Sequence, residues 1–316
     1  MTRVGAIDCG TNSIRLLVAD IDPVTGASTD VHRQMEVVRL GHGVDRTGRL
    51  DPAAIARTLA RSSDYHATCR RLGAERVRFV ATSASRDAEN AAEFVDGVRA
   101  IFTDYAIEPE VVSGAEEAAL SFRGATVDVT AAGFPGPYLV VDLGGGSTEF
   151  VRGTTVVEAA RSVDIGCVRM TERHLVSDPP TAAEVAAATA DIDAAIAAAE
   201  EEVGFSGIRT LVGLAGSITT VTAYALGLTA YDPERIHLSN LTAGEIVEST
   251  TALLAATRAE RSAIGFMHPG RVDVIGAGAL VWQRIVARVS EVSALEAIVT
   301  SEHDILDGIA LSLVRP

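Results

Sequence analysis

A short glycine turn that follows an acidic residue occurs twice in this chain, each time between two strand-like apolar segments. The two copies are Asp8-Cys9-Gly10-Thr11-Asn12-Ser13 and Asp142-Leu143-Gly144-Gly145-Gly146-Ser147. When Asp8 is aligned with Asp142, the first glycine and the serine of the two copies also coincide. A repeat of this kind predicts that one structural unit is present twice.

The length of the chain and the order of its predicted elements also favour two lobes. With 316 residues and 47% hydrophobic content, the chain is long enough to form two cores. Strand-like and helix-like segments alternate in both halves, which is typical of an α/β fold. The Pro/Gly-rich stretch 129–137 interrupts this pattern, so we predict domains at 1–130 and 131–316. Whether the final helix, predicted over 302–314, packs back on the first lobe stays open.

Several helix starts carry clear sequence signals. Asp51 followed by Pro52 predicts a helix that ends at Gly73. Capping boxes are found at Ser113/Glu116, Thr181/Glu184 and Thr242/Glu245. The first of these boxes places Glu116 and Glu117 in the first turn of a predicted helix.

Two further segments combine the end of a predicted strand with the start of a helix. Thr82-Ser83-Ala84-Ser85-Arg86 follows one strand, and Gly213-Leu214-Ala215-Gly216-Ser217-Ile218-Thr219 follows another. Free N–H groups at such helix starts bind anions, and glycine turns allow close approach of phosphate to the backbone. The candidate substrate-binding residues are therefore Thr11, Asn12, Ser13, Arg86, Gly144, Gly145, Gly146, Ser147, Thr148, Gly216 and Ser217, with Arg15 as an alternative phosphate ligand.

Charge and composition exclude several classes of function. The formal net charge is −15, and all 27 basic residues are arginine, which argues against broad nucleic-acid binding. The most apolar long segment, 182–199, contains three acidic residues, so we interpret it as a soluble helix and expect no membrane association. Three widely spaced cysteines and no visible export signal indicate a cytoplasmic protein.

The paired turns resemble those of the actin, Hsp70 and sugar kinase superfamily. Four further segments resemble motifs of the exopolyphosphatase and guanosine pentaphosphate phosphatase family within it. These segments are residues 81–86, 113–118, Asp142-Leu143-Gly144-Gly145-Gly146-Ser147-Thr148-Glu149 and Asp164-Ile165-Gly166-Cys167-Val168-Arg169. The resemblance spans essentially the whole chain, and it implies two duplicated actin-like, or ribonuclease H-like, lobes with a phosphate-binding cleft between them.

The resemblance also implies a set of catalytic roles. Glu117 would be the base that orients water for attack on the terminal phosphorus, although Glu116 is an alternative. Asp142 and Glu149 would hold Mg²⁺, or Mn²⁺ in its place. Asp8 would either contact the metal through water or cap its own turn. A carboxylate base, a metal and amide-rich turns are what phosphoryl transfer to water needs.

The expected activity is hydrolysis of the terminal phosphate of inorganic polyphosphate or guanosine pentaphosphate, which would connect the protein with the stringent response. Larger family members carry a helical C-terminal domain, which is not visible here, so we expect short substrates. Family members often form homodimers. Two alternatives stay open: an ATP-dependent phosphotransferase or switch of the same superfamily, and a binding protein that senses guanosine penta- or tetraphosphate.

A different mechanism is suggested by the run from Cys9 to Arg15, which matches the C-x5-R loop of cysteine-dependent phosphatases. In those enzymes the loop leads into a helix, whereas here a strand is predicted to follow. Asp8 would also raise the pKa of the thiol. We therefore interpret the match as accidental. The other cysteines are predicted to be buried small hydrophobes, and His42, His237 and His303 show no ligand spacing.

Overall fold

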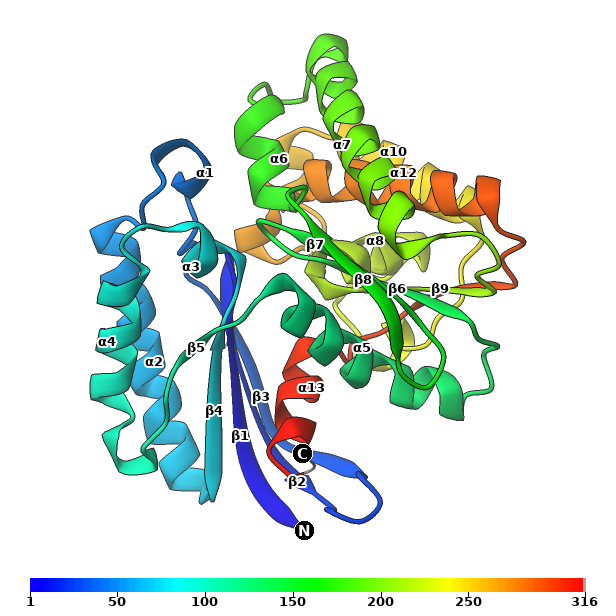
Figure 1. Cartoon of the computed structure of the whole chain (residues 1–316). Coiled ribbons are helices and arrows are strands. Elements are labelled where there is room, and N and C mark those ends of the chain that lie inside the picture. The colour runs from blue at the N-terminus through cyan, green and yellow to red at the C-terminus, as the bar shows by residue number, and fades with distance from the viewer. Residues whose placement is uncertain (315–316) are drawn as a thin grey trace. The chain divides into compact units, whose positions relative to one another are not determined.

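The computed structural model describes residues 1–314, which divide into two compact units (Figure 1). The first unit contains residues 1–124 and 305–314, and the second contains residues 125–304. The chain therefore passes between the units twice. The predicted boundary at 130/131 lies at the end of the helix within which the first crossing occurs.

The first unit is a five-stranded sheet with helices on both faces. Its strands are β1 (Thr2–Cys9), β2 (Ser13–Ile21), β3 (Ser28–Val37), β4 (Arg76–Ala81) and β5 (Glu110–Val111). Its helices are α1 (Val44–Thr47), α2 (Pro52–Leu72), α3 (Ser83–Asp87), α4 (Ala91–Ile101), the 3₁₀ turn η1 (Thr103–Tyr105), the start of α5 (Gly114–Ala131) and α13 (Ile305–Ser312).

The second unit contains the remaining elements. Its strands are β6 (Tyr138–Leu143), β7 (Thr148–Gly153), β8 (Val157–Val163), β9 (Thr210–Leu214) and β10 (Ala297–Thr300). Its helices are the end of α5, α6 (Cys167–His174), α7 (Ala182–Val203), α8 (Ala215–Ala225), α9 (Pro233–Ile236), α10 (Ala243–Ala255), α11 (Arg258–Ser262), the 3₁₀ turn η2 (Pro269–Arg271) and α12 (Ile275–Val292).

The two sheets have the same topology. The first has the order β3-β2-β1-β4-β5, and the second has the order β8-β7-β6-β9-β10. In each sheet the first three strands in sequence form an antiparallel meander, and the fourth strand pairs in parallel with the first. This equivalence confirms the duplication predicted from the two turns, and with it the duplicated actin-like fold class.

The side chains of β1 alternate between the two faces of the first sheet, and each face is covered by different helices. Ile7 and Cys9 pack in the cluster formed with α2 and α4, whereas Val4 and Ala6 pack in the cluster formed with α13. Successive side chains of a strand point to opposite faces, so one apolar strand serves two cores. Figure 1 shows α2 and α4 on one side of this sheet and α13 on the other.

The predicted helix starts are confirmed where the signals were strongest. Asp51 accepts hydrogen bonds from two N–H groups of α2, and Gly73 ends that helix with φ of 73°. The capping boxes at Thr181 and Thr242 are both complete. The helix that starts at the Ser113 box ends at Ala131, just before the first glycine of the stretch 129–137, Gly133.

No helix within residues 1–314 is long and apolar enough to cross a membrane. The apolar sequence of the long helix α7 is interrupted by acidic residues. Its side chains Ile192 and Ile196 pack in the core of the second unit.

Candidate phosphate and metal sites

The two repeated turns have the same backbone geometry. The N–H of Gly10 donates to the carbonyl of Ser13 at 2.9 Å, and the N–H of Gly144 donates to the carbonyl of Ser147 at 3.0 Å. Each turn joins the first two strands of its sheet, so its position at the strand ends is fixed by the pairing of those strands.

The carbonyl groups of both turns point into the protein. In the first unit, the Asn12 carbonyl accepts from the N–H groups of Val38 and Arg39, and the Thr11 carbonyl accepts from Gly41. In the second unit, the carbonyls of Gly144, Gly145 and Gly146 accept hydrogen bonds from backbone N–H groups of residues 166–169, at the start of α6. In both cases the segment that follows the third strand of the sheet binds the turn from behind.

Two adjacent N–H groups in each turn are candidates for binding a ligand. Among residues 1–314, no acceptor is found for the N–H groups of Thr11 and Asn12, or for those of Gly145 and Gly146. Adjacent amides that point the same way form an anion-binding concavity. The structure thus gives each unit a backbone geometry suited to phosphate oxygens.

Gly166 is required for the close packing of α6 behind the second turn. A Cβ atom at this position would lie 2.3 Å from the backbone carbon and oxygen of Gly145. Neither atom belongs to a flexible side chain, so the turn itself would have to move. The glycine predicted from the motif at 164–169 therefore has a steric reason.

We expect Gly166→Ala to destabilise the protein by about 1–3 kcal/mol, the usual cost of overpacking, and to reduce turnover because the amides of the turn are displaced. Calorimetric unfolding and an activity assay measure the two effects. Gly244→Ala is the matched control, since its Cβ would lie 3.9 Å from the nearest atom, the Thr242 hydroxyl. Equal behaviour of the two variants would contradict this role of Gly166.

The residue paired with the acid before each turn differs between the units. Asp8 lies opposite Arg15 across β1 and β2, and Asp142 lies opposite Glu149 across β6 and β7. Residues directly opposite each other in an antiparallel pair project on the same face. The duplication therefore places an acid and a base together in one unit, and two acids together in the other.

Asp8 and Arg15 form an ion pair. The Arg15 Nε and Nη2 atoms both donate to Asp8 Oδ2, at 3.0 and 2.7 Å. This ion pair was not among the roles expected for Asp8. A metal contact of Asp8 stays a prediction, and so does a role for Arg15 in binding phosphate.

The Asp142 and Glu149 carboxylates fit a divalent cation. Both residues are buried, with Asp142 6% exposed and Glu149 fully buried, and Ser162 donates to Glu149 Oε1 at 2.7 Å. Two adjacent buried carboxylates repel each other unless a cation or protons neutralise them. Hard oxygen donors are the ligands that Mg²⁺ prefers, and Mg²⁺ keeps several waters beside one or two carboxylates.

Glu117 is paired with Arg86. The Arg86 Nη1 atom donates to Glu117 Oε2 at 2.9 Å and to the carbonyl of Val112 at 3.0 Å. Glu117 is only 8% exposed, and it lies in the first turn of α5 as predicted. The structure brings the candidate base and a candidate phosphate ligand together, and the guanidinium stabilises the negative charge of the carboxylate.

Glu116 has a different role from the one expected. The N–H of Glu116 does bind the Ser113 hydroxyl, at 3.2 Å, but the Glu116 carboxylate accepts from Arg78 at 2.6 Å. Only half of the predicted capping box therefore forms, because the nearby guanidinium is a stronger partner for a carboxylate than a backbone amide is.

Two buried hydroxyls lie near the first turn. Thr11 Oγ1 and Ser85 Oγ have no hydrogen-bond partner within the described part of the chain. A Cβ on Gly41 would lie within 3 Å of both the Thr11 side chain and Ala84, so Gly41 lies against both the turn and the segment 82–86. Unsatisfied buried hydroxyls are costly, which is consistent with their serving a polar ligand.

Arg271 lies over the start of α8, and sequence reasoning missed it. A Cβ on Gly216 would lie 2.1 Å from Nη2 of Arg271, so the guanidinium rests against this glycine. Ser217 is 6% exposed, and its hydroxyl lies between Cys167 and Gly278. Thr148, another candidate, donates to the carbonyl of Ile165 at 3.1 Å. A remote arginine that covers a glycine helix start leaves no local pattern in the sequence.

Cys9 has the properties of a structural residue. It is 1% exposed in β1, and burial, followed by the charge of Asp8, raises the pKa of its thiol well above the usual range. The following residues form β2 rather than a helix, and Arg15 is paired with Asp8. The geometry of a cysteine-dependent phosphatase loop is therefore absent from this segment.

We expect Cys9→Ser to keep most of the phosphatase activity, because the thiol touches no candidate reacting atom. The native thiol should also resist alkylation by iodoacetamide at neutral pH, since the thiolate is the reactive form. Mass spectrometry before and after unfolding measures this protection. Complete loss of turnover in a folded Cys9→Ser protein would instead support the cysteine mechanism.

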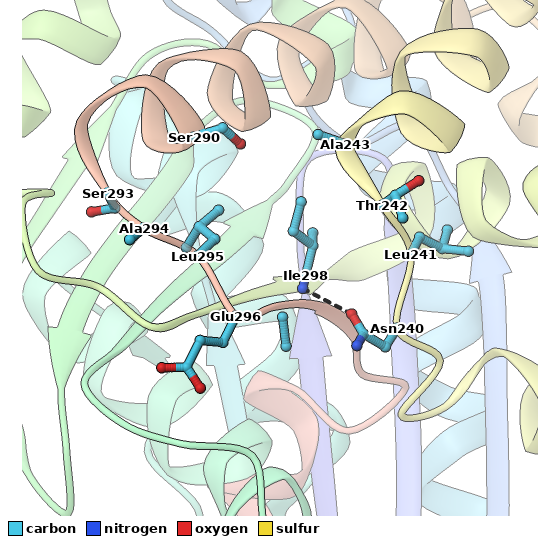
Figure 2. A pocket seen from close by; sticks show the side chains of 11 residues that line it. Asn240, Leu241, Thr242, Ala243, Ser290, Ser293, Ala294, Leu295, Glu296 and Ile298 are labelled. Atoms are coloured by element: carbon cyan, nitrogen blue, oxygen red, sulfur yellow. Dashed lines mark hydrogen bonds between the residues drawn. The ribbon is translucent and has the colours of Figure 1, made fainter.

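The second unit also contains a pocket of about 450 Å³, which Figure 2 shows beside β10. It is lined by Asn240, Leu241, Thr242, Ala243, Ser290, Ser293, Ala294, Leu295, Glu296, Ala297 and Ile298. No basic residue and no candidate site residue is among them. The pocket therefore does not suit a phosphate chain.

Comparison with known proteins agrees with the fold and with the site motifs. The Ppx/GppA phosphatase family matches residues 17–314. Exopolyphosphatase 2 of Mycobacterium tuberculosis is 50% identical over 99% of both chains. A guanosine-5'-triphosphate,3'-diphosphate pyrophosphatase of Aeromonas salmonicida is 33% identical over 67% of this chain and 42% of its own.

Solved structures give the same result. An exopolyphosphatase-like protein has a TM-score of 0.94 and 44% identity, covering 99% of this chain and 97% of its own. The Aquifex aeolicus member of the Ppx/GppA family has a TM-score of 0.80 and 30% identity, with the same two coverages. This chain belongs to the Ppx/GppA phosphatase family. The resemblance stated from its motifs is thereby confirmed, together with the reaction class of a phosphatase.

Proposed function

We propose that this protein is an exopolyphosphatase that hydrolyses the terminal phosphate of inorganic polyphosphate, guanosine pentaphosphate, or both. One observation carries the proposal: two equivalent turns each leave adjacent N–H groups without an acceptor, and only the second turn stands beside two buried carboxylates. Amides suit the phosphate oxygens of a linear polyanion, and the carboxylate pair suits a divalent cation.

The first unit supplies the group that activates water. Glu117, as the base, accepts the proton of a water molecule that attacks the terminal phosphorus, and Arg86 holds the carboxylate in place from its position on α3. The hydroxyls of Thr11 and Ser85 are further donors for phosphate oxygens. Positioning and charge neutralisation account for most of the catalysis of phosphoryl transfer.

The second unit supplies the cation site and further phosphate contacts. Asp142 and Glu149 hold Mg²⁺, and Ser162 orients Glu149 through its hydrogen bond. When bound, the cation neutralises negative charge on the phosphoryl oxygens. The Gly145 and Gly146 amides bind phosphate directly, and Arg271 at the start of α8 adds a positive charge.

The relatives support the substrate class. One is named an exopolyphosphatase, and a more distant one is named for the 5'-triphosphate,3'-diphosphate of guanosine. Because the net charge is −15, we infer short rather than long polyphosphate, since extended chains need a long basic track. Cytoplasmic location and a homodimer remain part of the proposal.

The test is phosphate release from short polyphosphate, long polyphosphate, guanosine pentaphosphate and ATP, each with and without Mg²⁺. We expect Mg²⁺-dependent release from short polyphosphate or guanosine pentaphosphate, and the ratio of kcat/KM values names the preferred substrate. Turnover of ATP alone would make the protein a kinase or a switch. Tight binding of guanosine pentaphosphate without any release would make it a sensor.

A further inference from the structure

Three ligand-type side chains from distant parts of the sequence meet within the second unit, apart from the phosphate turns. They are Asp128, His237 and His303, and their potential ligand atoms all lie within 4.8 Å of one another. His303 Nδ1 lies 2.5 Å from Asp128 Oδ2, and His237 Nε2 lies 3.7 Å from the same oxygen. The two imidazole rings are tilted, with centroids 4.7 Å apart.

Each of the three residues is held by its own element. Asp128 lies on α5, and His237 is the residue that caps the C-terminus of α9, where its backbone N–H binds the carbonyl of Pro233. His303 lies in the turn before α13, where its N–H and carbonyl both bind the Ser301 hydroxyl. Ligands on ordered backbone need little rearrangement when an ion binds.

The cluster is reachable from solvent and contains one acidic residue. The exposed side-chain fractions are 34% for Asp128, 21% for His237 and 38% for His303. The Asp128 carboxylate supplies the one acidic ligand of the cluster.

The distances between the potential ligand atoms are close to those of a metal site with three protein ligands. Imidazole nitrogens and carboxylate oxygens bind Zn²⁺ at about 2.0–2.2 Å, so tetrahedral ligand atoms lie roughly 3.3–3.6 Å apart. The 3.7 Å between His237 and Asp128 already meets this spacing, while His303 must move away from Asp128 to admit the ion. Two imidazoles and one carboxylate favour a transition metal over Mg²⁺, which prefers oxygen ligands and water.

We propose that Asp128, His237 and His303 form a binding site for a divalent transition-metal ion such as Zn²⁺, distinct from the carboxylate pair of the second turn. The proposal does not depend on the phosphatase reaction. Three protein ligands leave a fourth position for water or another ligand, as in an open zinc site.

Binding of the ion should change which nitrogen of the His237 ring carries the proton. The N–H of Glu302 donates to His237 Nδ1, so in this structure Nε2 is the protonated nitrogen that faces Asp128. An ion on Nε2 requires that proton to move to Nδ1, which breaks the hydrogen bond from Glu302. Glu302 in turn accepts from the Tyr231 hydroxyl at 2.6 Å, and the Tyr231 oxygen lies 2.8 Å from the Thr219 hydroxyl of α8. These contacts form a chain from the cluster to the helix that Arg271 covers.

The test uses Co²⁺ as a spectroscopic probe and Zn²⁺ as its competitor, with metal-free full-length protein in excess Mg²⁺. We expect one Co²⁺ per chain with visible d–d absorption, displaced by Zn²⁺ and unaffected by Mg²⁺. His303→Ala, His237→Ala and Asp128→Asn should each weaken Co²⁺ binding by about tenfold or more.

His174→Ala is the matched control, because His174 also contacts an aspartate, Asp191 at 2.9 Å, but without a second imidazole. This variant should bind Co²⁺ as the unaltered protein does. Glu149→Gln should also keep Co²⁺ binding, which separates the cluster from the catalytic cation site. Thermal unfolding shows which variants are folded. Absence of Co²⁺ binding in the unaltered protein, or equal binding in His303→Ala and His174→Ala, would overturn the proposal.

Discussion

Replacing Glu117 with glutamine is expected to lower kcat for phosphate release by a factor of roughly 10²–10⁴, the usual contribution of a general base. Glutamine keeps the size of the side chain and can still contact Arg86, so the buried first turn of α5 should stay packed. It cannot accept a proton from water. KM should change little, because Glu117 is proposed to act on water rather than on the substrate.

Glu116→Gln provides a matched control in the adjacent position. The Glu116 carboxylate is 45% exposed and pairs with Arg78, whereas the Glu117 carboxylate is 10% exposed and pairs with Arg86. We therefore expect Glu116→Gln to retain activity within about threefold, because exposed ion pairs contribute little. A severe loss in Glu116→Gln with an active Glu117→Gln would exchange the two roles.

The second large effect is expected for Glu149→Gln, which should weaken Mg²⁺ binding and remove most of the turnover. The buried pair of Asp142 and Glu149 is the one place where the second unit has two acids on paired strand positions. With one charge removed, the affinity for Mg²⁺ should fall by at least about tenfold. Titration of activity with Mg²⁺ measures this change.

Glu149→Gln is also expected to change how Mg²⁺ affects the unfolding temperature. Without metal, Glu149→Gln should unfold at the same temperature as the unaltered protein or at a higher one, because a buried repulsion is removed. Added Mg²⁺ should raise the unfolding temperature of the unaltered protein, since a ligand of the native state stabilises it. The variant should lose that increase. Glu158→Gln, an acid 43% exposed on β8, is the control that should keep it. An undiminished Mg²⁺ effect in Glu149→Gln would place the cation elsewhere.

Much of the fold could be predicted from local signals. Asp51, Gly73 and the boxes at Thr181 and Thr242 mark helix ends through hydrogen bonds within a few residues, so the chain carries the information locally. The Ser113 box was predicted just as strongly and formed only in part. The carboxylate of Glu116 instead binds Arg78, which is distant in sequence but close in the fold.

Some residues of the candidate site could likewise be predicted from local motifs, whereas their contacts could not. Glu117, Asp142 and Glu149 were found from short motifs. The ion pair of Asp8 with Arg15 and the salt bridge of Arg86 with Glu117 needed the strand register and the packing of α3 on α5. His237 and His303 showed no ligand spacing in the sequence, since the residue that joins them, Asp128, comes from another helix.

The sequence alone determined that one unit occurs twice, because the repeated turn and its flanking strands are local patterns that survive duplication. Only the tertiary structure decided how the copies differ. The register of β1 with β2 sets Arg15 against Asp8, and that of β6 with β7 sets Glu149 against Asp142. The physical reason is that charge pairing depends on which side chains share a face of a sheet, and strand pairing fixes this over distances that no local pattern records.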